Sequence, residues 1–476
     1  MSLDAEICRR LPLADATLHL LDFLVGADFL ADVFERNRGR CYERVISFPD
    51  LVHLLSDALL LNGQSAHRSI QQARADGTLT SSCKAVYDKI ARMPINLSAA
   101  MLIESSVRLR ELLPPSYAEP VPTSLAAFTL LAFDGKKIKD VAHRLKATRS
   151  VRGQVLGGKI LVAEDILTGL AVAMEAHLDG EASDLVLLPG LLTRVRGVLD
   201  GPRLWVADRL FCDLTHLPLL QAEGDRFVIR HQSKVKFHCD PETPVRTGTN
   251  ARGQSFTEEW GWLGFPKDKR RLKVGRTTVH RPGEEDVAVV TDLLDSQLYP
   301  PSDILDIYLR RWGIERLFQK ITEVFHLQAL VSAREKGTVF QAALCLLLYN
   351  LTVVIRAHVA AGARRESETV SMEKLFGDVC RQLTSVVEVL GPPVVVAYYA
   401  DVQWTAAGLR TYLADVLGRT WRDWWIKSKP RKPSPPTPTK YLVGGHSSVY
   451  RIVRGQHRTV PERKRKAKAT RRPSKQ

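Results

Sequence analysis

Cysteine is sparse in this sequence, and the patterns that usually give it a structural role are missing. The seven cysteines are scattered, without a Cys-x-x-Cys pair or a Cys/His spacing, which argues against a zinc site and a disulfide framework. The first residues also lack a basic stretch followed by an apolar run and a small-residue cleavage site, so no signal peptide is predicted. A reducing cytoplasm is the expected setting.

Long hydrophobic runs are also scarce, and Val339–Arg356 is almost long enough to span a bilayer. Gln341 and Asn350 interrupt it, and Arg356 and His358 end it. These polar residues favour the buried helix of a soluble domain over a membrane span. We therefore expect no membrane association.

Acidic residues are nearly absent from the C-terminal part of the chain. Of the 68 Lys and Arg residues, 16 lie within 427–476, against the single acid Glu462, so residues 1–426 are close to neutral. The net charge of +16 therefore comes from this tail. An uneven charge of this kind indicates a tail that contacts an acidic polymer rather than a basic folded body.

The length of 476 residues, with 45% hydrophobic and 25% charged residues, indicates a soluble protein of two or three domains. Helical periodicity at the start, over 18–34, 51–61 and 85–90, gives way after Pro114-Pro115 to short apolar runs of strand length. The predicted domains are 1–115 (helical), 124–223 with 293–330 (an α/β core), 224–292 (a β-rich insertion), 331–426 (helical) and 427–476 (basic and disordered).

Two predicted strands each run directly into an aspartate. The strand Leu125–Phe133 leads into Asp134-Gly135, and Leu204–Ala207 leads into Asp208. Taken alone, Asp-Gly after a strand is more typical of a hairpin turn, and a lone Asp is more typical of a cap or turn residue. Each aspartate is a weak signal by itself.

A third acidic residue stands on a predicted helix that begins at Pro300-Pro301-Ser302-Asp303, with Ser302 as its N-cap. At about 100° per residue, Glu315 lies about 20° from Tyr308 and about 40° from Arg311 around the helix axis. An ordinary surface ion pair between Arg311 and Glu315 is the alternative interpretation. The apolar residues predicted to form the buried face are Ile304, Leu305, Leu309, Trp312, Leu317, Phe318 and Ile321.

Taken together, Asp134, Asp208 and Glu315 are the residue types that two divalent cations require. Mg²⁺ and Mn²⁺ prefer oxygen ligands, and two ions about 3.5–4 Å apart can activate a hydroxyl and stabilise the leaving oxygen of a phosphodiester. Residues so far apart in sequence can meet only through the fold.

These motifs resemble the DDE transposases of bacterial insertion sequences, in the insertion-sequence-four branch with the Y-(2)-R-(3)-E-(6)-K signature. Tyr308, Arg311 and Glu315 match its first three letters, and Asp134 and Asp208 match the two aspartates, over roughly 125–330. The signature places a lysine where this chain has Thr322, and Lys320 lies about 140° from Glu315 around the helix.

The resemblance implies an α/β fold with a ribonuclease-H-like core, in which Asp134, Asp208 and Glu315 hold Mg²⁺ (or Mn²⁺), two ions in all. It implies a cytoplasmic bacterial protein that binds double-stranded DNA at terminal inverted repeats and at a target. Cleavage releases a 3′-hydroxyl, which attacks the target DNA after a hairpin intermediate. A homodimer is expected because two element ends must be joined.

Further DNA contacts are predicted outside the carboxylates. Tyr308 and Arg311 can contact phosphate, whereas Trp260 and Trp262 either stack on an unpaired base or fill the core of the insertion. The N-terminal helices are expected to bind the repeats through His67-Arg68 and Gln71–Arg74, or these residues form a solvated face. The tail residues predicted to bind phosphates without sequence preference are Arg463, Lys464, Arg465 and Lys466.

Two other functions remain open. Because Thr322 replaces the lysine, the chain can be a non-catalytic derivative that occupies element ends as an inhibitor. A host nuclease of ribonuclease-H-like fold would cleave DNA without strand transfer. Joining of a pre-cleaved end to plasmid separates a transposase from such a nuclease.

Overall fold

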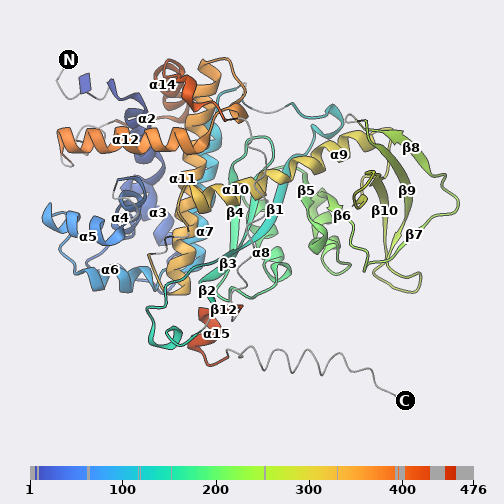
Figure 1. The fold of residues 1–476 in the computed structure, drawn as a ribbon, viewed down its shortest axis with the longest axis horizontal. Coiled ribbons are helices and arrows are strands. Elements are labelled where there is room, and N and C mark those ends of the chain that lie inside the picture. Colours follow the sequence, from blue (N-terminus) through green and yellow to red (C-terminus); the bar gives the residue numbers. More distant parts are fainter. Residues whose placement is uncertain are drawn as a thin grey trace.

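The architecture is a long mixed sheet with helices from both ends of the chain gathered at one side of it (Figure 1). The computed structural model describes residues 6–7, 10–61, 65–115, 117, 120–151, 153–250, 253–327, 329, 331–391, 395, 402–428 and 445–456. The predicted tail contacts Arg463, Lys464, Arg465 and Lys466 lie outside these residues.

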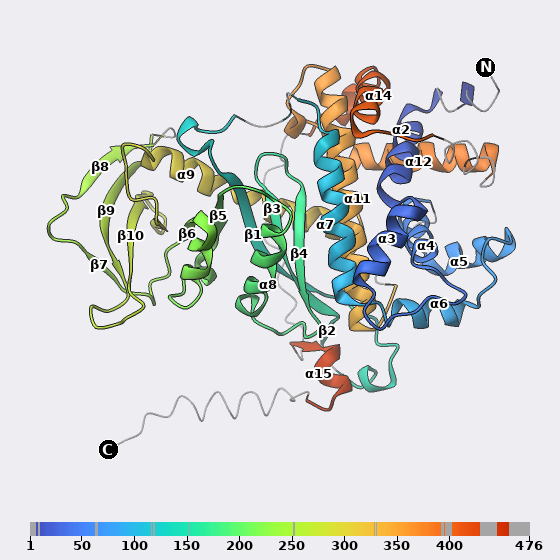
Figure 2. The same cartoon turned by 180° about the vertical axis from the view of Figure 1, so that it is seen from behind.

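The N-terminal region is helical, as predicted. Its helices are α2 (Pro12–Val25), α3 (Ala27–Asn37), α4 (Phe48–Leu60), α5 (Ala66–Ala75), α6 (Cys83–Ile90) and α7 (Ile95–Leu112). The single helix expected over 18–34 is two helices, because Gly26 adopts an extended backbone (φ −55°, ψ 150°) between α2 and α3. The long helix α7 packs against α11 and the edge strand β4 (Figure 2).

Five strands form the central unit, with the spatial order β4-β3-β1-β5-β6. Strands β1, β5 and β6 are parallel, whereas β3 is antiparallel to both β1 and β4. The helix α8 (Asp184–Arg196) connects β4 to β5. This order and these directions are those of a ribonuclease-H-like fold, so the predicted fold class is confirmed. The strands are β1 (Thr129–Ile138), β3 (Gly158–Asp165), β4 (Ala171–His177), β5 (Arg203–Ala207) and β6 (Arg226–Arg230).

The β-rich segment predicted at 224–292 continues this sheet rather than forming a separate one. Its first strand, β6, belongs to the central unit, and β11 pairs antiparallel with β6. The order then runs β11-β10-β9-β7, with β8 also paired to β9. These strands are β7 (Phe237–Cys239), β8 (Arg246–Thr249), β9 (Ser255–Leu263), β10 (Leu272–Val279) and β11 (Val287–Thr291).

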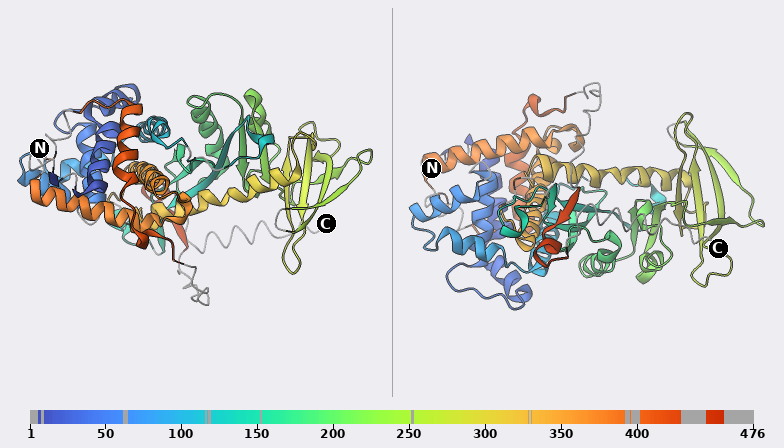
Figure 3. Two further views of the ribbon diagram at one scale, coloured as in Figure 1. Left: turned by 90° about the horizontal axis from the view of Figure 1, so that it is seen from above. Right: turned by 60° about the horizontal axis from the view of Figure 1, so that its bottom comes forward.

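Two consecutive helices return the chain from this β-rich end to the helical side, and they cross one face of the sheet (Figure 3, left). They are α9 (Pro301–Arg310) and α10 (Trp312–Glu323), and α10 packs on β1 and β3. The helix α8 packs on β3 and β4 from the opposite face (Figures 1 and 2). Pro300 is the N-cap of α9, so the predicted cap at Ser302 is wrong; Pro301 at the first helical position has no N–H left to satisfy.

The apolar run predicted to be core is the helix α11 (Glu335–Gly362). It is long and apolar enough to cross a membrane, and its most apolar stretch is wholly buried inside the protein. The polar side chain of Asn350 within it exchanges two hydrogen bonds, both 2.8 Å, with the backbone of Ala171 on β4. The helix α11 therefore connects the sheet with the surrounding helices.

The C-terminal part continues with α12 (Met372–Leu390) and α14 (Ala406–Gly418). Residues 427–476 were expected to be disordered, but 445–456 are folded. The strand β12 (His446–Ser448) pairs in parallel with β2 (Gln154–Leu156), and α15 (Val449–Val453) follows. Arg451 makes ion pairs with Asp179 (2.7 Å) and Glu181 (2.8 Å), which holds this segment beside the central sheet.

Candidate active site

Asp134 and Asp208 lie on neighbouring parallel strands. The pairing of β1 with β5 ends at Ala132 opposite Val206, and each aspartate is two residues further along its strand. Beyond this point β1 continues to Ile138, paired only with β3. Asp134-Gly135 is therefore part of a strand and not the hairpin turn that the dipeptide alone would favour.

The glycine after Asp134 has a packing role. Side chains alternate along a strand, so Gly135 faces the side opposite to Asp134. A Cβ atom there would lie 1.9 Å from Oδ1 of Asp184, the first residue of α8. Lys159 pairs with the same carboxylate at 2.7 Å. Asp184 thus lies on the opposite face of β1 from Asp134 but is near enough to contribute to its raised pKa. Sequence reasoning missed it because its position at a helix start is typical of an ordinary cap residue.

The environment of Asp134 disfavours its ionised form. Burial is the main cause that raises the pKa of Asp134 to about 6, the carboxylates of Asp208 and Asp184 act in the same direction, and the hydrogen bond from the Gly135 backbone and the charge of Arg311 oppose the rise. Clustered carboxylates of this kind are stabilised by a cation placed between them.

Asp208 is held at the end of β5 by its own backbone. It caps the short helix η3 (Arg209–Phe211), and its Oδ1 accepts a hydrogen bond from Leu210 N at 2.9 Å. The capping alternative is thus correct for one oxygen of Asp208. The other oxygen is left for another ligand.

Tyr308, Arg311 and Glu315 occupy one stripe where α9 passes into α10. Arg311 has helical backbone angles between the two helices and donates from Nη2 to Glu315 Oε1 at 2.8 Å. Tyr308 is buried, and the guanidinium carbon of Arg311 lies 5.9 Å from its ring centre. Burial raises the pKa of Tyr308, and Asp208 contributes to the same rise. This stripe therefore faces the two aspartates.

Arg311 lies between Glu315 on α10 and Asp134 on β1. Its side chain is only 7% exposed, against 39% for Glu315, so the pair is not an ordinary surface ion pair. Burial opposes its charge, but the hydrogen bond to Glu315 and the charges of Tyr308, Glu315 and Asp134 raise the pKa of Arg311. Its Nε has no hydrogen-bond partner in the described structure. A buried guanidinium with a spare donor is suited to a phosphate oxygen.

The donor set fits a divalent cation only in part. Asp134 and Asp208 supply carboxylate oxygens from adjacent strands, and the pKa of Asp134 is raised mainly by burial and also by the charge of Asp208, which a cation would offset. However, no group of three His, Cys, Asp or Glu side chains is placed to hold a metal ion within the described ranges. The two aspartates therefore form a partial site, while Glu315 is bonded to Arg311.

Trp312 is an exposed aromatic at this site. It was predicted to lie on the buried face, but it is 54% exposed. It borders open depressions on both sides, one beside Glu315 and one beside Tyr308. No sequence signal distinguished it from its buried neighbours.

Thr322 does not replace the missing lysine. Its hydroxyl donates to Phe318 O of the same helix at 2.7 Å. Lys320 lines a separate pocket on the other side of α10, away from Glu315. This position agrees with the rotation of about 140° from Glu315 around the helix axis that is expected for Lys320.

Trp260 and Trp262 lie far from the carboxylates, on β9, which is five strands from β1 in the sheet order. Trp260 is buried, and its indole N–H donates to Leu294 O at 3.0 Å. Trp262 is half-buried under Arg271, whose guanidinium carbon lies 4.5 Å from the ring centre. The packing of Trp260 agrees with the core alternative, and the structure does not bring either tryptophan to the carboxylates.

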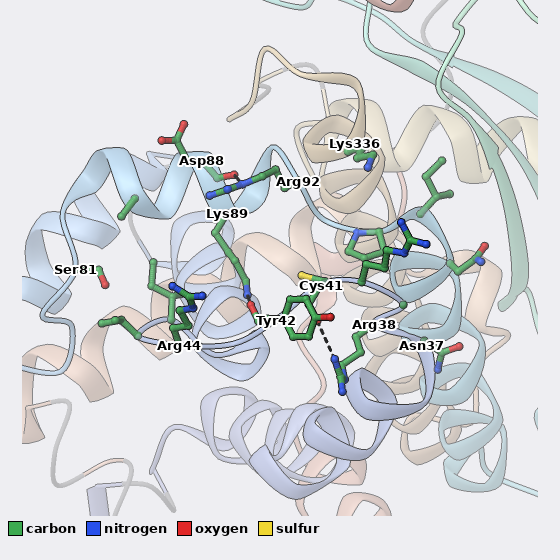
Figure 4. Close-up of a pocket in the computed structure, with 18 residues that line it drawn as sticks. Asn37, Arg38, Cys41, Tyr42, Arg44, Ser81, Asp88, Lys89, Arg92 and Lys336 are labelled. Atoms are coloured by element: carbon green, nitrogen blue, oxygen red, sulfur yellow. Dashed lines mark hydrogen bonds between the residues drawn. The ribbon is translucent and has the colours of Figure 1, made fainter.

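Basic side chains in the N-terminal region gather away from the predicted surface on α5. His67, Arg68 and Arg74 are exposed on that helix. An open groove of about 1070 Å³ lies instead beside the 39–46 loop and α6 (Figure 4). Tyr42, 69% exposed, stands in it between Arg38 and Lys89. Its basic lining residues are Arg38, Arg40, Arg44, Lys89, Arg92 and Lys336.

The fold and the acids at its strand ends define a ribonuclease-H-like protein with a candidate metal-dependent site. Residues 129–351 match the family model described as the transposase DDE domain, which supports a DDE transposase. The matched range contains Asp134, Asp208 and Glu315.

Comparison with solved structures finds a likeness to the cryo-EM structure of the piggyBac transposase synaptic complex with hairpin DNA. The identity is 12%, 85% of each chain is covered, and the TM-score is 0.35. No curated protein sequence matches this chain.

Proposed function

We propose that this protein is a transposase of the insertion-sequence-four branch that cuts DNA at transposon ends and joins them to target DNA. The observation that carries the proposal is the placement of Asp134 and Asp208 on adjacent parallel strands, facing the helix that bears Arg311 and Glu315. The family match over 129–351 supports the same reading.

In this proposal the carboxylates of Asp134, Asp208 and Glu315 hold Mg²⁺ or Mn²⁺, two ions in all. Bound divalent ions would supply activation of the attacking oxygen and stabilisation of the leaving oxygen. Asp134 binds in its ionised form. Glu315 would join these ligands if its bond to Arg311 is released, and the guanidinium would then be available to bind a phosphate of the DNA backbone.

The proposed partners are the terminal inverted repeats and target DNA, bound by a homodimer in the bacterial cytoplasm. The groove that contains Tyr42 offers one surface for DNA, since it combines six basic side chains with an exposed aromatic. Trp312 offers another beside Glu315, where stacking would help to hold a distorted end and a hairpin intermediate.

The experiment is cleavage of DNA that carries the inverted repeats flanking this reading frame. We expect Mg²⁺-dependent nicking that exposes a 3′-hydroxyl, followed by joining of a pre-cleaved end to plasmid. Cleavage without joining would indicate a ribonuclease-H-like nuclease instead.

One observation favours a second function. The bond between Arg311 and Glu315, and the lack of a three-ligand cluster in the described residues, suit a non-catalytic derivative that occupies transposon ends as an inhibitor. Tight binding to the ends without nicking in either Mg²⁺ or Mn²⁺ would identify this derivative.

A further inference from the structure

A second polar pocket lies behind the helix that carries Glu315. It has a volume of about 750 Å³ and is enclosed by α10, α11, the end of β3 and the segment after α11. Gly313 and Lys320 line it from α10, whereas Glu315 and Trp312 line the depressions on the other side of the same helix. We name it the α10–α11 pocket.

Positive charge is in excess in the α10–α11 pocket. Seven Arg and Lys side chains line it, against three Glu side chains. Glu368 alone is shared by Arg356 (3.0 Å), Lys427 (3.3 Å) and Arg316 (3.9 Å). Lys320 and Arg364 have no ion-pair or hydrogen-bond partner for their side chains in the described part of the chain. The acidic side chains therefore do not balance the positive charge of the pocket, and an anionic ligand would balance it.

Two deeply buried polar atoms on its wall also lack partners. Nε of Arg356 and Oε2 of Glu164 make no hydrogen bond, although the two residues are only 6% and 4% exposed. Burial raises the pKa of Glu164 well above its usual range, which favours its protonated form. Leaving buried hydrogen-bonding groups without partners destabilises a fold.

We propose that the α10–α11 pocket binds a phosphate group. A phosphate oxygen can accept a hydrogen bond from Nε of Arg356, and its charge offsets that of Lys320 and Arg364. In its protonated form Glu164 can donate to the same group. The phosphate comes either from free phosphate in solution or from the backbone of a bound strand. The inference stands independently of the proposed cleavage reaction.

The test uses the full chain without Mg²⁺ or substrate DNA. Inorganic phosphate is titrated at constant ionic strength while the Tm and the heat of binding are measured, with acetate as the anion control. We expect saturable binding and a Tm increase with phosphate and not with acetate. A 5′-phosphorylated trinucleotide in a parallel titration distinguishes the sources: tighter binding than phosphate assigns the site to a strand, and equal or weaker binding assigns it to free phosphate.

The double variant Lys320→Gln/Arg364→Gln should bind the preferred probe at least fivefold more weakly. Neither side chain has a partner to lose, so the fold should persist, and circular dichroism checks this. Lys269→Gln, an exposed lysine beyond β9, is the matched control and should bind as the wild type does. Absence of binding by both probes, or equal binding by the double variant, would overturn the inference. Failure to nick DNA would not affect it.

Discussion

The two sides of α10 have opposite chemistry. On one side Arg311 is bonded to Glu315 and lies near Asp134, so negative charge collects around one buried guanidinium. On the other side Lys320 and Arg316 join a pocket in which one carboxylate serves several cations. The comparison shows that a charged helix must be interpreted one face at a time. Residues five positions apart, such as Glu315 and Lys320, belong to different sites.

The largest effect on the rate of nicking is expected when one of the three carboxylates is replaced by its amide. Asp134→Asn, Asp208→Asn and Glu315→Gln each remove an oxygen ligand, so nicking should fall by about 10³-fold, equivalent to roughly 4 kcal/mol in the barrier. Gel analysis of end cleavage in Mg²⁺ measures this. Lys269→Gln, an exposed lysine beyond β9 and outside both sides of α10, is the control and should lower the rate by less than about threefold. Wild-type cleavage by any one carboxylate variant would remove that residue from the site.

A smaller effect on the rate of nicking is expected when Arg311 is replaced. Arg311→Lys keeps the charge but loses the planar fork, so nicking should fall about 10- to 100-fold. The neighbouring Arg310→Lys changes a partly exposed pair with Asp306 (2.9 Å) and should have little effect. Equal rates for the two variants would show that Arg311 contributes only charge.

The raised pKa of Asp134 should affect the thermal stability of the protein. Because the folded-state pKa of Asp134 is about 6, above the ordinary value of 3.8, the favourable protonated form is lost as the pH rises through 6. At pH 7.5 in EDTA, Asp134→Asn should therefore raise the Tm, by about 2–4 °C. The gain should shrink as the pH is lowered through 6 towards 4.

Calorimetry at both pH values tests this pH dependence. Asp306→Asn, which changes an acid away from the strand aspartates, serves as the control and should give no gain. A lower Tm for Asp134→Asn at pH 7.5 would show that the carboxylates do not repel one another.

The smallest effect concerns the missing lysine. Thr322→Lys should lower the Kd for end DNA about two- to fivefold at low salt and steepen the salt dependence by about one counterion. Thr322→Val, which removes only the hydroxyl bonded to Phe318 O, should leave the affinity unchanged. Fluorescence anisotropy over a range of salt concentrations measures both. No change for the lysine variant would place position 322 away from the DNA.

Much of the fold could be predicted from local patterns. The strand that contains Asp134, the strand that leads into Asp208 and the helix around Tyr308 are rich in apolar residues, so their type is clear from sequence. The exposure of Trp312 could not be predicted, because the helical apolar spacing continues through it.

Features that depend on contacts between residues far apart in the sequence could not be predicted. Asp184 comes near Asp134 only because β1 and α8 pack together at Gly135. The strand β12 could not be predicted within a basic, Pro-rich tail, since its order depends on pairing with β2 and on the ion pairs of Arg451. The α10–α11 pocket likewise combines Glu164, Lys320 and Arg356 from three separate elements.

The central claim is that the strand aspartates, and not the basic side of α10, hold a divalent cation. Mn²⁺ titration followed by electron paramagnetic resonance tests it without DNA. The account predicts saturable Mn²⁺ binding by the wild type and by Lys320→Gln, and at least about tenfold weaker binding by Asp134→Asn and Asp208→Asn. Equal Mn²⁺ affinity in the wild type and both aspartate variants would contradict it.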